Sequence, residues 1–373
     1  MFKTIIAAGS IMAGLSFSLT AGELIVNVKD AGASGNGTTD DSRAIRKAVA
    51  SINKNKSGKL FFPKGTYLFK SNGTALLFKG VSNVTVKFDK EAVLLIDNLK
   101  ADGRGNGHGI LFKDPGKNIA LDNITVQWKV NPKYRSNGDG IRFDGYPSAE
   151  KTISNILMSN CRVINAPQTG AIFHGCSDVT VTNFRPEHTK ADGLHFNACR
   201  KVKVDGVTGL DTGDDTLALV TYYHPTKIGA YREPNPPFNQ PSLGEWNNTG
   251  STAVNISTSG GRANGIRVAG GKDIAISNVS VKSKGFSGIQ IDAAQKTTAN
   301  RAVGWSYLAS KNIRINNVKV SDCPVGFIVR TLNILPDEPD HLWRHSVAVT
   351  NLDIKNCRNG IQLLDSGDIK IAG

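Results

Sequence analysis

The sequence lacks any long apolar run after its first 22 residues. Nothing later reaches the ~18 consecutive apolar residues that a membrane-spanning helix needs. Residues 1–22 combine Lys3 with an apolar run from Ile5 to Leu19 and small residues near Ala21, a pattern typical of a secretory signal peptide. The sequence therefore predicts no membrane span, and a mature protein of residues 23–373 that is secreted or periplasmic.

Metal-binding and nucleic-acid-binding signatures are also lacking. The five cysteines include no Cys-x-x-Cys pair and no spacing typical of a zinc site. Their odd number excludes complete pairing in disulfides. No signature of a nucleic-acid-binding module is present. These patterns predict no metal, no cofactor and no nucleic-acid partner, and a monomer is assumed.

Charge of one sign dominates the chain, with 45 Lys and Arg against 31 Asp and Glu and a formal charge of +14. A balance of this size favours a polyanionic partner. Because the cations are spread along the chain, an acidic glycan fits an exported protein better than nucleic acid. A basic surface that only maintains solubility is the alternative.

Strands dominate the chain after one early helix. Apolar residues recur every three or four positions just after Thr39, Asp40 and Asp41, which predicts an amphipathic helix with one of these three as N-cap. Its apolar residues are Ala44, Ile45, Ala48, Val49 and Ile52. A single helix ahead of many strands suits a cap over the open end of a sheet stack.

From Lys59 onward, the pattern x-Gly-apolar-x-apolar recurs, and three of its intervals are 23 residues. It starts at Asp139, Thr169, Asp192, Asp215, Asn264, Ser287, Val325 and Asn359, with the glycine replaced once, by Thr216. Longer intervals indicate the same coil with inserted loops, the longest at about residues 221–252. A repeat of about twenty residues buries its apolar face only by stacking. The prediction is an all-β fold, a single-stranded right-handed parallel β-helix with an N-terminal capping helix.

A second repeated position carries Asn or Asp, which tolerate the left-handed backbone of a sharp bend. We expect these residues to form one ladder inside the helix: Asn123, Asn155, Asn183, Asp205, Asn278, Asn317 and Asn351. The sequons at Asn123 and Asn278 would then be closed to a glycan. Cys176 with Cys199, and Cys323 with Cys357, share coil positions, so each pair forms either a disulfide or two buried thiols.

Alternation along each strand predicts an inward and an outward column of side chains. The inward column is Leu194, Phe196, Leu217, Leu219, Ile266, Val268, Ile289 and Ile291. The outward column is Arg142, Ile172, His195, Ala218, Arg267, Gln290, Ile328 and Gln362. Arg142, His195 and Arg267 thus project beside the acids at the strand entrances, as in a groove for a charged polymer.

The strongest candidate for chemistry is the pair Asp214–Asp215, one coil from Asp192. Carboxylates this close repel one another and should have separated pKa values, as paired acid and base catalysis needs. For Asp139 a turn-forming role is favoured. His195 is either a structural histidine or part of the groove.

Aromatic residues gather in the long insertion, where repeat scaffolds usually place binding loops. Tyr222, Tyr223 and Trp246 are predicted to bind substrate by stacking on sugars. The alternative is that these rings pack the loop onto the scaffold.

Two stretches resemble a known family. VKDAGASGNGTTDDSRAI resembles the N-terminal signature of pectate-lyase-like and polygalacturonase-like β-helix proteins. ADG followed by GDDTLAL is similar to the paired N-T-D and D-D motifs of polygalacturonase-type glycoside hydrolases. The resemblance implies inverting hydrolysis, with Asp192 and Asp215 as base and Asp214 as general acid.

The family's remaining motifs differ here. Its His-Gly falls at Asn264-Gly265 and its Arg-x-Lys at Gln290-Ile291-Asp292, so the residues that grip a galacturonate carboxylate are absent. Arg267, Arg142 or His195 are expected to replace them. The leading hypothesis is an inverting glycoside hydrolase acting on an acidic polysaccharide without a cofactor. The alternatives are a polysaccharide lyase or uronan epimerase, with Ca²⁺ bound by the aspartates in a lyase, and a non-catalytic carbohydrate-binding β-helix.

Overall fold

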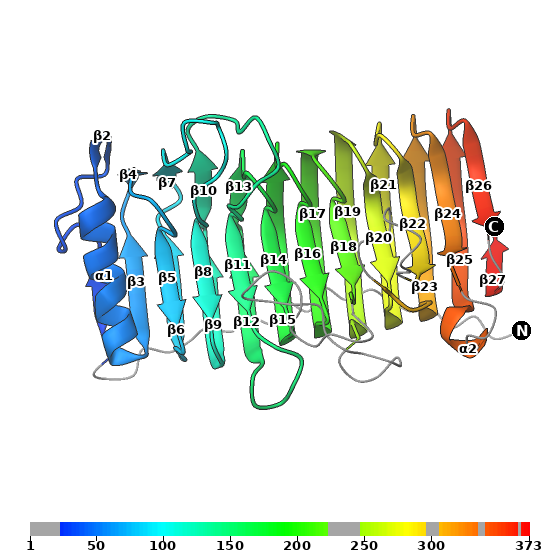
Figure 1. Cartoon of the computed structure of the whole chain (residues 1–373), viewed down its shortest axis with the longest axis horizontal. Coiled ribbons are helices and arrows are strands. Elements are labelled where there is room, and N and C mark those ends of the chain that lie inside the picture. Colours follow the sequence, from blue (N-terminus) through cyan, green and yellow to red (C-terminus); the bar gives the residue numbers. More distant parts are fainter. Residues whose placement is uncertain (1–22, 223–246, 296–305, 335–339, 365–366) are drawn as a thin grey trace, which may run out of the picture.

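Parallel strands stack in coils along one axis, with the N-terminal coils at one end and the C-terminal coils at the other (Figure 1). This computed structural model describes residues 23–222, 247–295, 306–334, 340–364 and 367–373. The predicted signal peptide, residues 1–22, lies outside this part of the chain. Among the described residues no helix is long and apolar enough to cross a membrane.

One wall of the stack is a ten-stranded sheet in which each strand pairs in parallel with the same strand of the next coil. Its strands are β5 (Leu76–Lys79), β8 (Ile110–Lys113), β11 (Ile141–Asp144), β14 (Ala171–His174), β16 (Leu194–Asn197), β18 (Leu217–Val220), β20 (Asn264–Ala269), β22 (Ser287–Ala294), β24 (Val325–Leu332) and β26 (Asn359–Leu364). The repeat positions predicted from the sequence fall at or just ahead of these strands.

The other strands form a seventeen-stranded parallel sheet that bends around the coil. They are β1 (Ile25–Asn27), β2 (Asn36–Asp40), β3 (Gly58–Phe62), β4 (Gly65–Phe69), β6 (Val84–Phe88), β7 (Ala92–Ile96), β9 (Gly116–Asp122), β10 (Thr125–Trp128), β12 (Ile153–Ser159), β13 (Arg162–Ile164), β15 (Cys176–Glu187), β17 (Arg200–Thr212), β19 (Thr249–Gly261), β21 (Lys272–Lys282), β23 (Lys311–Ser321), β25 (His345–Lys355) and β27 (Gly367–Ala372). A short helix, α2 (Asp340–Trp343), precedes β25. The right-handed parallel β-helix predicted from the repeat is confirmed.

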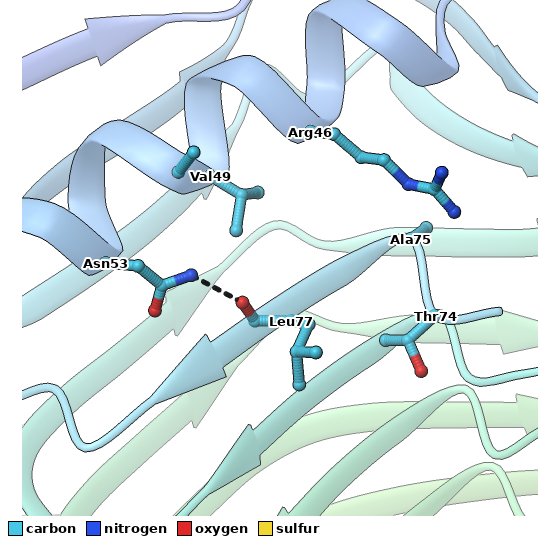
Figure 2. A pocket seen from close by; sticks show the side chains of 7 residues that line it. Arg46, Val49, Asn53, Thr74, Ala75 and Leu77 are labelled. Carbon is cyan, nitrogen blue, oxygen red and sulfur yellow. Dashed lines mark hydrogen bonds between the residues drawn. The ribbon is translucent and has the colours of Figure 1, made fainter.

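Helix α1 (Ser42–Asn55) covers the first coil, and its buried residues include the predicted apolar stripe. The side-chain amide of Asn53 forms two hydrogen bonds with the backbone of the edge strand β5. Its Nδ2 donates to Leu77 O at 2.7 Å (Figure 2), and its Oδ1 accepts from Lys79 N at 2.9 Å. Edge groups that would otherwise be open to another chain are thereby paired. The N-cap residue is Asp41, which makes no side-chain capping bond; its carboxylate accepts from Ser34 N and Gly35 N instead.

The core runs along the axis of the coils. All eight residues predicted to point inward are at most 1% exposed. A column of stacked phenylalanine rings runs through the preceding coils and ends at Phe196, with centroid separations of 4.5–4.9 Å between successive rings. The column is Phe78, Phe112, Phe143, Phe173 and Phe196. Period-two alternation in the sequence therefore located the core correctly.

The asparagine ladder differs from its prediction in two ways. Its members point outward, and those of β15 onward are exposed. The residues also form two ladders: Asn155 bonds to Asn118, whereas Asn183 bonds to Asn160 and Asn317 to Asn278. The left-handed φ at each bend directs the side chain out of the coil, so the sequons at Asn123 and Asn278 do not lie inside the helix.

Two further predictions concern boundaries and thiols. Most of the insertion predicted at about residues 221–252 lies outside the described residues, and β19 begins at Thr249. All five cysteines are free thiols, and four of them are buried. The stacked cysteines are therefore free thiols and not disulfides, and Cys357 is the one that is only partly buried.

Candidate active site

Three aspartates meet where the turns enter the ten-stranded sheet. Asp192 stands two residues ahead of β16, and Asp214 and Asp215 stand just ahead of β18, one coil further on. One carboxylate oxygen from each lies within 4.8 Å of the others. The 23-residue repeat places Asp192 next to Asp215, as the sequence predicted.

The acids at the strand entrances also hold the coils together. Asp192 Oδ1 accepts from Asp215 N at 2.9 Å, and Asp215 Oδ1 accepts from Asn264 N at 3.3 Å and Asn264 Nδ2 at 2.7 Å. Asp139 accepts from Thr169 N in the same manner at 3.0 Å. Each carboxylate thus binds the backbone of the following coil, which fixes its orientation.

Asp214 has a different environment, since its carboxylate is bound by a cation. Its Oδ2 accepts from Arg135 Nη1 at 2.6 Å. Lys284, which is 1% exposed, donates from Nζ to Thr212 Oγ1 at 2.8 Å and to Asp214 O at 3.1 Å. The lysine therefore fixes the turn that carries Asp214 and Asp215.

The environment separates the pKa values of the three acids. Burial alone would raise the pKa of Asp192, but the hydrogen bond from His195 and the charge of Arg135 lower it overall. Burial and the charge of Asp192 raise the pKa of Asp214, and Arg135 opposes this only in part. Burial and both neighbouring carboxylates raise the pKa of Asp215 well above its usual value. The separation is the one expected of a paired acid and base.

A cavity of about 370 Å³ opens beside Asp214. It is lined by Asp214 and five cationic side chains, together with Gly213, Ala263, Asn264, Phe286 and Gln290. The cations are Arg135, Lys190, Arg262, Arg267 and Arg330. A second cavity of about 390 Å³ adjoins it and shares Arg135, Lys190, Gly213 and Arg262. An anionic ligand is the natural complement of this lining.

Three of the predicted binding residues lie at the site but are already engaged, namely His195, Arg267 and Tyr222. His195 is 6% exposed, and its Nδ1 lies 2.7 Å from Asp192 Oδ2, so it orients the carboxylate. Arg267 lines the cavity while forming a two-pronged ion pair with Asp292, with both N–O distances 3.0 Å. Its Nη1 donates to Tyr222 Oη at 3.2 Å. The Tyr222 ring packs edge-on against Tyr307 with centroids 5.7 Å apart.

Arg142, a further predicted binding residue, does not line the cavity. Arg142 lies three strands before β18 and is held by Asp139 Oδ2 at 3.0 Å and Asp144 Oδ1 at 2.7 Å. Its guanidinium charge is already neutralised by these two carboxylates, which hold it away from the cavity. Asp139 is a buried ion-pair partner as well as a turn residue. Tyr223 and Trp246 lie outside the described residues.

Several site residues were missed by the sequence analysis, although the repeat contains a signal for them. Lys190 and Arg262 each stand two residues ahead of a strand-entrance residue, Asp192 and Asn264. Arg330 follows Ile328 by two residues and therefore shares its outward parity. Arg135 and Lys284 have no such signal, because they come from turns outside the aligned pattern.

The three aspartates fit Ca²⁺ poorly. Ca²⁺ needs six to eight oxygen ligands. Here Asp192 and Asp215 already accept hydrogen bonds from the neighbouring coils, and Arg135 occupies an oxygen of Asp214. Lys284 adds a further buried cation next to the cluster. The reaction proposed for this site uses no metal.

The right-handed parallel β-helix and its acid cluster can now be compared with known proteins. Residues 25–195, a little less than half of the chain, match the family model described as rhamnogalacturonase A/epimerase, pectate lyase-like. Over these residues the chain is similar to pectate-lyase-like proteins, as the sequence resemblance implied.

Individual known proteins share only a low sequence identity with this chain. Polygalacturonase ADPG1 of Arabidopsis thaliana is 24% identical over 213 residues, covering 52% of this chain and 47% of its own. The chain spans about half the length, or less, of such curated relatives. An exopolygalacturonase from Thermotoga maritima shares the fold with a TM-score of 0.55 and 12% identity, covering 94% and 92% of the two chains. An alginate lyase from Paenibacillus has a TM-score of 0.54 and 13% identity, covering 86% and 96%.

Proposed function

We propose that the protein is an exported glycoside hydrolase that cleaves an O-glycosidic bond in an anionic polysaccharide. The observation that carries this proposal is the pairing of two features. Three close carboxylates have pKa values shifted in opposite directions, and one of them lines a cavity with five cationic side chains. The acids supply proton transfer, and the cations supply affinity for the substrate.

Asp214 is the general acid of this proposal. It is the member of the trio that lines the cavity, and its raised pKa keeps a proton available to a leaving group. Arg135 occupies Oδ2, so the proton is assigned to Oδ1. The proton passes to the glycosidic oxygen as the bond between that oxygen and the anomeric carbon breaks.

Asp192 is the base. Its lowered pKa keeps it ionised, and His195 holds Oδ2 in place. A water molecule attacks the anomeric carbon and gives its proton to Asp192, which balances the proton lost from Asp214. The family resemblance implied a base role for Asp215 as well. Its strongly raised pKa instead favours a protonated Asp215, which orients Asn264 and limits the negative charge of the trio.

Stereochemistry is a separate part of the proposal. The carboxyl groups of many inverting enzymes are roughly 6.5–9.5 Å apart, whereas retaining pairs are roughly 5–5.5 Å apart. Oxygens of the present trio lie within 4.8 Å of one another. The family resemblance implied inversion. Inversion requires that the water attack from the Asp192 side of the sugar ring, opposite the leaving oxygen, which lies at Asp214. Proton NMR of the first product formed distinguishes the two anomers.

A panel of acidic and neutral glycans, each incubated with the protein in the presence and absence of a chelator, tests the activity. New reducing ends without unsaturation, unaffected by the chelator, are expected from an acidic glycan. Unsaturated ends that absorb in the ultraviolet would replace hydrolysis by β-elimination. A changed uronate composition without cleavage would indicate an epimerase, and binding without any product would indicate a non-catalytic protein.

A further inference from the structure

Three consecutive coils place a cation, a glycine and a cation at one position beside the acids. Lys190, Gly213 and Arg262 each stand two residues ahead of a strand-entrance residue. Backbone hydrogen bonds confirm the alignment, since Gly213 N donates to Thr189 O and Arg262 N to Thr212 O. Stacked strands lie ~4.8 Å apart, so the two cationic residues are separated by about 10 Å of backbone. Gly213 adds no side chain between them and packs closely on the preceding coil, since an added Cβ would lie 2.5 Å from Lys190 O.

Lys190 and Arg262 have no acidic partner within the described part of the chain, unlike the other cations of the cavity. Arg135 pairs with Asp214, and Arg267 pairs with Asp292. Both unpaired residues line each of the two adjoining cavities, so they stand at the junction between them. Gly213 shares this junction and directly precedes Asp214.

Two residues that line the same cavity have a buried polar atom without a partner among the described residues. Gln290 is 2% exposed, and its Oε1 accepts no hydrogen bond, although its Nε2 donates to Asp292 Oδ2 at 2.8 Å. Arg330 Nε is likewise buried without an acceptor. A buried polar atom left unpaired costs about 1–3 kcal/mol, so a ligand that pairs these atoms is favoured. Gln290 Oε1 needs a donor such as a sugar hydroxyl, and Arg330 needs an acceptor.

We propose that Lys190 and Arg262 bind an anionic group of the substrate between them, above Gly213, while Gln290 Oε1 accepts from a hydroxyl of the sugar seated in the cavity. This inference rests on the proposed function and adds the residues that determine which substrate is bound. The anion is a carboxylate or a sulfate ester. It is bound from the turns beside the acids, whereas the family's Arg-x-Lys position on the sheet here holds Gln290 and Asp292. The site selects a glycan that is charged next to the bond to be cleaved.

The test uses binding, so that it does not depend on turnover. The Asp214→Asn variant is titrated with a carboxylated glycan (polygalacturonate), a sulfated glycan (carrageenan) and a neutral glycan (dextran). Titrations are repeated after adding Lys190→Gln or Arg262→Gln, with Lys203→Gln on the exposed face of β17 as a matched control. Each site substitution should weaken binding of the preferred acidic glycan about tenfold, a typical loss for one charge-assisted contact. Dextran binding and the control should not change.

Equal weakening by Lys203→Gln would overturn the proposal, because it would show attraction by overall charge alone. Unchanged affinity in both site variants would also overturn it. Preference between the two acidic glycans identifies the anionic group. The proposed function is judged separately by wild-type product formation, so a protein that cleaves an acidic glycan while its Lys190 and Arg262 variants bind normally retains the function and loses this subsite. Failure to bind either acidic glycan would overturn the subsite, whereas the proposed function would still be decided by product formation in the glycan panel.

Discussion

Replacing Lys284 with methionine removes a buried charge from the site and keeps a side chain of similar length. Lys284 Nζ donates to Thr212 Oγ1 and to Asp214 O, and burial lowers its pKa to about 8. At neutral pH it is therefore mostly protonated beside Asp192 and Asp214. A nearby cation stabilises ionised carboxylates, so its loss raises the pKa of both acids.

The size of this shift follows from Coulomb's law. One pKa unit corresponds to about 1.4 kcal/mol. Lys284 Nζ lies 3.1 Å from Asp214 O and so roughly 5–8 Å from the carboxylate of that residue, where two unit charges interact by roughly 2–3 kcal/mol at an effective dielectric constant of about 20. The Asp214 carboxylate is partly exposed to solvent, which reduces this energy toward that of one pKa unit. The Lys284→Met variant should therefore move both limbs of the pH–rate profile upward by on the order of one pH unit. The acid limb reports deprotonation of Asp192, and the alkaline limb reports deprotonation of Asp214.

Initial rates on the substrate found in the glycan panel, measured from acidic to alkaline pH, provide the assay. Lys319→Met, at an exposed position on β23, is the matched control and should leave the profile unchanged. A lower rate with both limbs in place would mean that Lys284 only fixes the turn. Limbs that move downward would refute the electrostatic argument.

Three further predictions concern Asp215, the cap and metal dependence. Asp215 has a raised pKa in the folded protein, so the stability it contributes is present at low pH and is lost as the pH rises through that pKa. Asp215→Asn should therefore raise the melting temperature by about 1–3 °C at neutral pH and leave it unchanged at low pH. A decrease at neutral pH would contradict this. Asn53→Ala removes both hydrogen bonds to β5 and should destabilise the protein by about 1–2 kcal/mol in thermal or denaturant unfolding, whereas Asn55→Ala, which loses only contacts to Ser57, should change it little. Chelation of divalent cations should leave turnover unchanged, and a loss restored by Ca²⁺ would show that the acids bind metal.

Much of the fold could be predicted because the repeat constrains every coil in the same way. Leu194 and Phe196 were assigned to the core from alternation alone, and the strand stack follows from burying that face. The asparagine ladder was misplaced because the sequence marks the bend and not the direction of the side chain. Asn155 and Asn183 occur in similar sequence contexts but stand at different bends of the coil.

The site was predictable only where the repeat supplied the alignment. Asp192 and Asp215 occupy a repeated position, and Asp214 is adjacent, so their proximity followed from the register. Arg135 reaches Asp214 from a turn 79 residues earlier, and Lys284 from one 70 residues later. Such contacts depend on the path of individual turns. Arg142 shared the outward column with Arg267, but its neighbours Asp139 and Asp144 hold it away from the cavity.

The account depends most directly on Asp214 as the proton donor. The decisive measurement is the rate of reducing-end formation from an acidic glycan by Asp214→Asn, compared with wild type and with Asp211→Asn. Asp211 is an exposed neighbour in the adjoining cavity and serves as the matched control. Loss of a general acid lowers the rate by about 10²–10⁴-fold, and this decrease is expected for Asp214→Asn at unchanged melting temperature. Wild-type turnover by Asp214→Asn, or an equal loss in Asp211→Asn, would contradict the assignment.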